Sequence, residues 1–274
     1  MSPARELIRN YEHAEIRASV LAQLDHVRQA VRTLTPEELS APTRLGDWTV
    51  RDLAVHIALA VGAIAGAATL AEPSQTEFAL LDWPLRTVDY AEAFDRATRE
   101  AVDALEGATG TGGTTEALGE LYDRTARALA DTLDANTGDR LLATRCGGMR
   151  LDDHLVTRAV ELIVHTDDLN AATGRGITLE RQALAACVRL LADALAERAP
   201  GGSVEVRIPP YAVVRCVEGP RHTRGTPINV VETDPLTWIR LATGRTGWDE
   251  ALAATRVRAS GERADLSGLL PLLA

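Results

Sequence analysis

Apolar residues recur at spacings of three and four along the first part of the chain, as they do in amphipathic helices. Residues 13–34 carry one such stripe, formed by Ile16, Val20, Leu24, Val27, Val31 and Leu34. Residues 50–71 are apolar nearly all round, which predicts a helix at the centre of a bundle. Further stripes predict helices over 90–105, 118–133 and 151–173. The first part of the chain is therefore predicted to be an α-helical up-down bundle.

Two threonines mark helix starts within this part. Thr35 is followed by a proline at the first helical position and by Glu38 three residues later, the pattern of a capping box. Thr49 precedes the apolar helix, and Asp52 stands in its first turn, where a carboxylate also meets the positive end of the helix dipole. The capping signals predict a short helix and then a long one.

The pattern changes after Gly176. One more helix is predicted, followed by short runs of alternating apolar and polar residues that predict β-strands. The predicted helices are 179–199, 235–243, 248–254 and 266–273, and the predicted strands are 204–208, 211–217, 228–231 and 256–260. Helices first and mixed elements second indicate two domains, which we place at 1–176 and 177–274.

The composition narrows the classes of partner. The net charge is −10, and all 29 basic residues are arginine, without a dense basic cluster, so we expect no nucleic-acid binding. The three cysteines are widely spaced and form no CxxC pair, which favours free thiols in a reducing cytoplasm. We expect a cytoplasmic protein, with a monomer as the default state.

Residues 53–70 form the longest apolar stretch and look at first like a membrane span, but the stretch is too short and too weakly apolar to cross a membrane comfortably. The stretch consists mainly of alanine and glycine and is interrupted by His56, so a buried bundle helix explains it better. The first fifteen residues are charged and polar, unlike a signal peptide. We therefore expect no membrane partner.

Five polar side chains share one face of the helix 151–173. They are His154, Arg158, Glu161, His165 and Asp168, separated by steps of four, three, four and three. Glu161 and His165 lie one turn apart, so both can reach one point. A carboxylate and an imidazole suit zinc or another divalent ion.

A third ligand has to come from elsewhere, and His56 is the candidate because it lies in the middle of the apolar helix. A buried imidazole needs a partner for each ring nitrogen. Asp52, one turn earlier, is expected to hold one nitrogen of His56, and Asp168 is expected to hold His165 in the same way. Spacing alone leaves two interpretations open, a metal site and a set of ordinary polar residues. A histidine in the middle of a helix is often a hydrogen-bonded core residue, and the pattern ExxxH occurs by chance in many helices.

Two segments resemble a known family. Residues 48–56, Trp-Thr-Val-Arg-Asp-Leu-Ala-Val-His, and residues 158–169, with Arg158, Glu161, His165 and Asp168, are similar to the two signatures of the mycothiol-dependent maleylpyruvate isomerase family. That resemblance implies a DinB-like four-helix bundle in which His56, Glu161 and His165 bind zinc. Residues 232–261 are similar to the sterol-carrier-protein-like domain that often follows such bundles, which implies a small α+β domain.

The resemblance also implies an activity: a zinc-dependent isomerase or thiol S-transferase that uses mycothiol on a small electrophilic substrate, carboxylated or not. His154 and Arg158 are then candidates for cofactor binding, although a histidine near a helix start is also typical of a surface. Arg221 and Arg224 are candidates for the arginine that the second domain supplies to catalysis, or belong to a solvated basic loop. The alternatives are a non-catalytic metal-binding protein and a lipid or sterol carrier.

Overall fold

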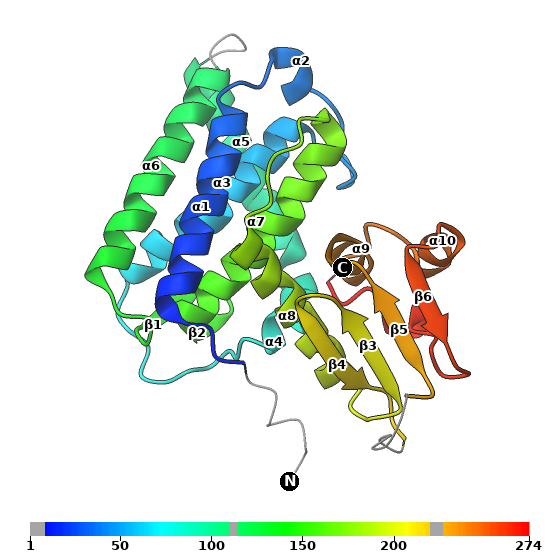
Figure 1. Ribbon diagram of the computed structural model, residues 1–274. Coiled ribbons are helices and arrows are strands. Elements are labelled where there is room, and N and C mark those ends of the chain that lie inside the picture. The colour runs from blue at the N-terminus through cyan, green and yellow to red at the C-terminus, as the bar shows by residue number, and fades with distance from the viewer. Residues whose placement is uncertain (1–8, 110–113, 220–226, 274) are drawn as a thin grey trace. The chain divides into compact units, whose positions relative to one another are not determined.

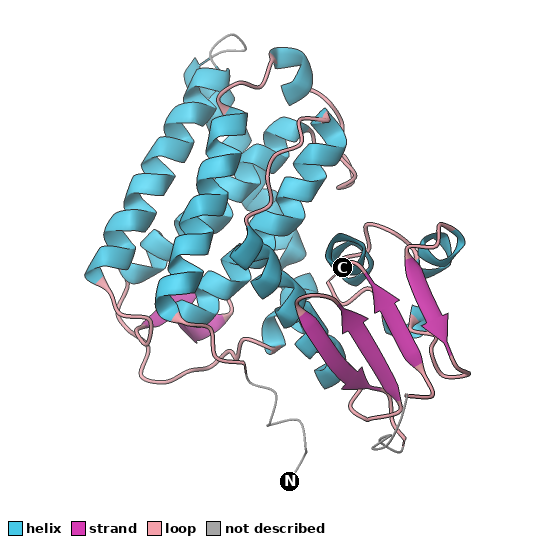
Figure 2. Cartoon of the chain, viewed as in Figure 1, coloured by secondary structure: helices cyan, strands magenta, loops and turns pink. Residues whose placement is uncertain are grey.

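A computed structural model describes residues 9–109, 114–219 and 227–273 of the chain. These residues divide into two compact units. The first contains residues 11–80 and 89–184, and the second contains residues 81–88 and 185–273 together with Arg9 and Asn10. Figure 2 shows that the first unit is almost entirely helical and that the second contains a four-stranded sheet. A mostly helical region followed by a small α+β domain is the predicted fold class; the boundary at 176/177 stays a prediction.

The core of the first unit lies between α1 (His13–Val31), α3 (Val50–Ala68), α6 (Thr114–Ala135) and α7 (Leu151–Thr173) (Figure 1). Both α1 and α3 pack against α6 and α7, so the four helices enclose one core. The helix α5 (Ala91–Thr109) packs against α3 and α6.

The helix α3 lies at the centre because its apolar residues point in several directions. Its fully buried residues are Val50, Leu53, Ala54, Val55, Ile57, Ala58, Val61 and Ile64. By length and composition α3 is apolar enough to cross a membrane. Its packing against α5, α6 and α7 is that of a core helix in a bundle, as the sequence predicts.

The capping box predicted at Thr35 is present, and the cap predicted at Thr49 forms part of a second capping box. Thr35 Oγ1 accepts from the backbone N–H of Glu38 at the start of α2 (Pro36–Leu39), and Glu38 accepts from the backbone N–H of Thr35. Thr49 and Asp52 make the same reciprocal pair at the start of α3. Each box satisfies backbone donors that a helix start leaves unpaired.

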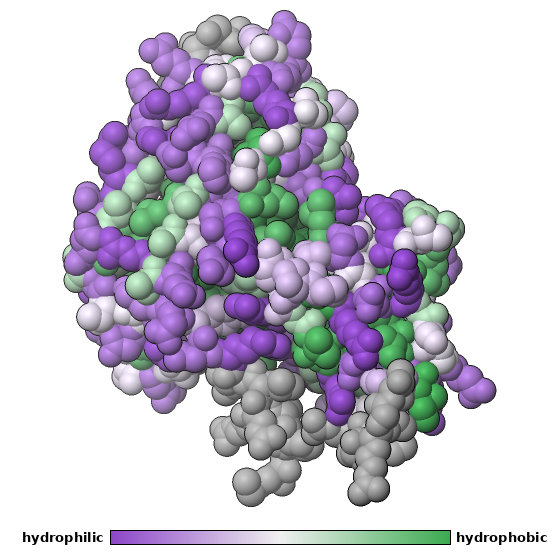
Figure 3. Space-filling model, viewed as in Figure 1, coloured by the Kyte–Doolittle hydropathy of each residue, from purple (hydrophilic) through white to green (hydrophobic). Residues whose placement is uncertain are grey.

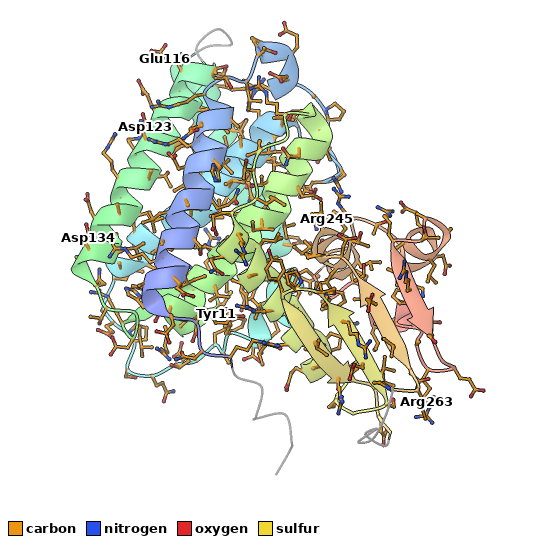
Figure 4. All side chains as sticks on the ribbon, viewed as in Figure 1. Tyr11, Glu116, Asp123, Asp134, Arg245 and Arg263 are labelled. Atoms are coloured by element: carbon orange, nitrogen blue, oxygen red, sulfur yellow. The ribbon has the colours of Figure 1, made fainter. Side chains whose placement is uncertain are left out.

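The outer faces of α1 and α6 are joined by ion pairs. Asp134 pairs with Arg17, and Asp123 pairs with Arg28 and Arg32. Figure 4 labels both aspartates on α6, and Figure 3 shows that the visible face of this unit is mostly hydrophilic. These exposed pairs fit a solvated surface over an apolar core.

The second unit consists of a mixed sheet and short helices. Its strands are β3 (Val204–Ile208), β4 (Ala212–Cys216), β5 (Val230–Thr233) and β6 (Val257–Ser260), in the order β4-β3-β5-β6. The pairing of β3 with β5 is parallel, and the other two pairings are antiparallel. Its helices are α4 (Asp82–Arg86), α9 (Pro235–Ala242) and α10 (Trp248–Ala253), with most of α8 (Arg181–Arg198), which begins in the first unit.

Alternation along β3 follows the prediction. Val204, Val206 and Ile208 are buried. Glu205 lies on the other face and pairs with Arg207 at 2.7 Å and with Arg215 at 3.1 Å. One face of the sheet is therefore apolar and the other carries charge.

One predicted element is wrong, and one hairpin was not predicted. Residues 266–273 form only a 3₁₀ turn (Ser267–Leu269), because Pro271 disfavours the helical conformation at the residue before it. The sequence also gave no sign of the hairpin formed by β1 (Leu141–Thr144) and β2 (Gly147–Arg150). Two glycines at the start of β2 leave that strand with no alternation of apolar and polar side chains.

Candidate metal centre

The three predicted metal ligands lie together in the first unit. His56 comes from α3, and Glu161 and His165 come from successive turns of α7. Glu161 Oε2 is 3.5 Å from Nε2 of His56 and 3.1 Å from Nε2 of His165. One ligand atom from each residue lies within 4.8 Å of the others. The packing of α3 on α7 is what joins residues more than one hundred positions apart in the sequence.

A carboxylate on the same helix holds His165. Its Nδ1 lies 3.0 Å from Asp168 Oδ2, as the spacing predicts. A carboxylate only accepts, so Nδ1–H donates to Asp168, and Nε2 is left as the ring nitrogen that faces Glu161. Arg44 Nε lies 3.4 Å from the other oxygen of Asp168. The buried carboxylate is thus fixed from two sides.

A threonine on α5 holds His56. Its Nδ1 lies 3.2 Å from Thr98 Oγ1, and that hydroxyl donates to the backbone oxygen of Phe94 at 2.9 Å. Since the threonine hydrogen is used, Thr98 accepts from His56 Nδ1–H. This arrangement also leaves Nε2 as the ring nitrogen that faces Glu161.

The expectation that Asp52 holds His56 is wrong. Oδ2 of Asp52 accepts from both the backbone N–H and the hydroxyl of Thr49, each at 2.7 Å. The carboxylate is committed to capping α3, one turn before His56. Thr98 occupies the role that we assigned to Asp52, and nothing in the sequence around Thr98 signals it.

The aromatic residue of the first signature lies against the same histidine. The rings of Trp48 and His56 have centroids 4.9 Å apart, and Trp48 Nε1 donates to Asp95 Oδ1 at 2.7 Å. Trp48 and Thr98 together limit the rotation of the His56 ring. The sequence indicated the tryptophan through the signature but not this contact.

Burial and mutual contacts shift the pKa of each residue in the ligand set. Burial opposes ionisation of Glu161, but its interactions with His165 and His56 outweigh that effect and hold the pKa of Glu161 well below its usual range. Burial lowers the pKa of His56, which keeps that ring neutral at neutral pH. Burial also opposes protonation of His165, but hydrogen bonds to Asp168 and Glu161 raise its pKa.

These residues fit a divalent metal such as zinc. Two imidazole nitrogens and one carboxylate oxygen converge, and two histidines with a glutamate are a known set for catalytic zinc, with a fourth position open. The side chains of His56, Glu161 and His165 are 12%, 19% and 12% exposed. The convergence point is therefore shielded but still accessible to a small ligand.

The two predicted cofactor-binding residues extend the same face of α7. Arg158 is buried, and its NH2 lies 3.8 Å from Glu161 Oε1. Its NH1 donates to the backbone oxygen of Ala60 on α3 at 3.1 Å. His154 lies one turn nearer the start of α7 and is also buried. The alternative that it is a surface histidine is therefore wrong. Arg221 and Arg224 lie outside the described residues.

Comparisons with known proteins match both units. Residues 20–170, more than half of the chain, match the family model described as the mycothiol maleylpyruvate isomerase N-terminal domain. Residues 180–272 match the model described as the bacterial SCP ortholog. A search of curated proteins finds no match.

Among solved structures, the chain is similar to crystal structures of the mycothiol-dependent maleylpyruvate isomerase and of a histidine-to-alanine mutant of it. Each is 16% identical, with a TM-score of 0.56, and each alignment covers 97% of both chains. At this identity the likeness concerns the fold, and it extends over both units.

Proposed function

Because the chain belongs to the mycothiol maleylpyruvate isomerase family, a family of enzymes, we propose that it is a zinc- and mycothiol-dependent isomerase or thiol S-transferase. The observation that carries this proposal is the convergence of His56, Glu161 and His165 within 4.8 Å. The proposed substrate is a small electrophile. The family supports a thiol-dependent reaction, and the donor set supports zinc.

When bound by these ligands, zinc would supply a positive charge that lowers the pKa of a thiol and so provides a thiolate near neutral pH. The chain's own residues prepare the site for it. Asp168 and Thr98 fix the two imidazole rings with Nε2 inward. Glu161 contributes a negative charge at neutral pH. Fixed ligands lower the reorganisation needed when the thiol and the electrophile bind.

Four residues are proposed to act around this centre. His154 and Arg158 are proposed to contact the bound molecules, because they continue the ligand face of α7 and are buried. Arg221 and Arg224 are proposed as further contacts to the substrate from the second domain. A cytoplasmic location accompanies the proposal, in keeping with three free cysteines.

Metal analysis of the purified protein tests the ligand set. We expect about one zinc per chain in the wild type and loss of most of it in His56→Ala and Glu161→Ala, since each change removes one of three ligands. His26→Ala, on α1, is the control and should keep its zinc. Full zinc retention by both ligand variants would refute the assignment.

Thiol consumption separates an enzyme from a metal-binding protein without catalysis. Zinc-loaded protein is mixed with mycothiol and a panel of electrophilic enones, and both free thiol and isomer composition are followed. We expect loss of thiol or conversion between isomers, abolished in His56→Ala. A zinc-loaded protein that is inert toward the whole panel would favour the non-catalytic alternative.

A further inference from the structure

The face of α7 that carries two metal ligands continues toward the start of the helix with two buried polar residues. Arg158 lies three residues before Glu161, and His154 lies four residues before Arg158, so the three side chains are stacked along one side. His154 and Arg158 are 8% and 6% exposed. Neither is needed to complete the ligand set of His56, Glu161 and His165.

His154 has an unsatisfied ring nitrogen. Its Nε2 is buried, and within the described part of the chain no hydrogen-bonding group is in reach of it. Buried polar atoms in proteins are nearly always paired, so an atom without a partner points to a group that arrives with a ligand. Burial, and secondarily the nearby Arg158 cation, lower the pKa of His154 well below its usual value. The ring is therefore neutral and can present Nε2–H as a donor.

Arg158 supplies a buried positive charge beside the metal centre. Its guanidinium donates to Thr157 Oγ1 at 3.1 Å and to the Ala60 backbone oxygen, and its charged partner on α7 is Glu161, at 3.8 Å. Glu161 is also a ligand of the divalent ion proposed above. When Glu161 shares its charge with that ion, the cluster of ion, glutamate and arginine carries excess positive charge. Such a cluster favours an anionic ligand in addition to a thiolate.

We propose that Arg158 and His154 form the subsite for the carboxylate of the substrate, with the guanidinium pairing with that carboxylate and His154 Nε2–H donating a hydrogen bond to it. This inference rests on the proposed function and deepens it, because it specifies a carboxylate-bearing electrophile and assigns the carboxylate to the bundle. Guanidinium binds carboxylates with paired, charge-assisted hydrogen bonds. A carboxylate held at Arg158 keeps the rest of a small molecule within reach of the neighbouring metal centre.

Binding of an unreactive dicarboxylate, succinate, tests the subsite without relying on turnover. Calorimetric titrations would use zinc-loaded and zinc-free wild type, with the neutral diamide succinamide as the comparison ligand. We expect succinate to bind the zinc-loaded form at least about tenfold more tightly than the zinc-free form, and succinamide to bind neither. Equal succinate binding with and without zinc would overturn the coupling to the metal centre.

Variants then locate the carboxylate. Arg158→Gln and His154→Phe should each weaken succinate binding by roughly tenfold or more, whereas His154→Gln, which keeps a donor, should retain most of the affinity. Arg124→Gln, an exposed arginine on α6, is the control. Zinc content and the thermal midpoint are measured for each variant to show that it is folded. If Arg158→Gln does not fold, the comparison of His154→Phe with His154→Gln tests the carboxylate subsite.

Two outcomes contradict the inference while leaving the proposed function intact. One is wild-type succinate affinity in zinc-loaded Arg158→Gln and His154→Phe. The other is loss of affinity only in the double variant Arg221→Gln/Arg224→Gln, which would assign the carboxylate to the second domain. A wild type that holds no zinc would instead refute the proposed function itself, and the subsite with it.

Discussion

At the scale of single residues, the metal centre depends on hydrogen bonds that orient two imidazole rings. Asp168 belongs to the same helix as His165, so the step of three residues is enough to predict their contact. Thr98 belongs to a different helix from His56, and only the packing of α5 on α3 brings the two together. The orienting partner of His165 was therefore predictable from the sequence, and that of His56 was not.

Replacing Thr98 by valine tests the role of its hydroxyl. The side chain keeps its shape, but the acceptor for His56 Nδ1–H is lost, so the ring can rotate or change tautomer. We expect zinc affinity to fall by roughly tenfold, the low end for the loss of a group that orients a ligand. Competition with a chromophoric chelator measures the affinity.

The matched control is Thr132→Val on α6, whose hydroxyl also donates to a backbone oxygen within its own helix, that of Ala128. It should leave zinc affinity unchanged. If Thr98→Val binds zinc as tightly as this control, the hydroxyl has no part in orienting His56.

At the scale of elements, the sequence predicts the long helices and the four strands of the second unit, but it does not predict the hairpin of β1 and β2. The hairpin of β1 and β2 is held by residues from a separate segment, since Glu77 N–H donates to the Gly148 backbone oxygen at 2.8 Å. A Cβ at Gly148 would lie 2.6 Å from the backbone oxygen of Gln75, so only glycine allows this approach. No pattern in the local sequence predicts such a contact. The caps at the starts of α2 and α3 are predictable because each involves residues only three positions apart.

The short helix α2 is attached to the loop after α7 by an ion pair that should depend on pH. Arg175 donates to both oxygens of Glu38, at 2.7 and 2.5 Å. This pairing, with the hydrogen bond from Thr35 N–H, lowers the pKa of Glu38 to about 2. A folded-state pKa below the unfolded value of about 4.3 means that the stabilisation is present above that value and lost as the pH falls toward 2.

Glu38→Gln should therefore lower the free energy of unfolding by about 1 kcal/mol at pH 7, a modest figure because the pair is partly exposed. The difference from wild type should shrink between about pH 4.5 and pH 2. Urea titrations at several pH values measure it, with the exposed neighbour Glu37→Gln as the control. A difference that stays constant over this range would exclude the ion pair as its cause.

At the scale of the whole molecule, the family match and the likeness to solved structures extend over both units, and they agree with the predicted order of a helical region before an α+β domain. Within the first unit, the metal centre joins α3 to α7 near the middle of the bundle. A ligand that binds only the folded bundle must stabilise it. We therefore expect binding of the proposed metal to be coupled to folding of this unit.

Zinc should raise the thermal midpoint of the first unit. At a free zinc concentration one hundred times the dissociation constant, the gain is about 2.7 kcal/mol, which corresponds to roughly 5–10 °C for a unit of this size. Calorimetric scans with zinc and with a chelator measure the shift. Magnesium, which prefers oxygen ligands in an octahedral arrangement, should have little effect.

The same scans on His56→Ala should show almost no shift with zinc. An equal shift in that variant would mean that zinc stabilises the protein through other residues. The comparison holds even where the variant has a lower midpoint, because the quantity compared is the change on adding zinc.

The sequence by itself determined the features that depend on neighbours along the chain. The stripes of apolar residues, the two capping boxes, the pairing of His165 with Asp168 and the shared face of Glu161 and His165 all follow from the helical repeat. The position of His56 in the middle of an apolar helix made it the candidate for the third ligand, and the resemblance of two short signatures added the family.

Only the tertiary structure decided which side chains from separate helices meet. It brought Thr98 rather than Asp52 to His56, placed Trp48 on the same ring, and buried His154 with no partner for Nε2 among the residues that the structure describes. These contacts depend on the angle and register with which helices pack, and a helical repeat does not contain that information.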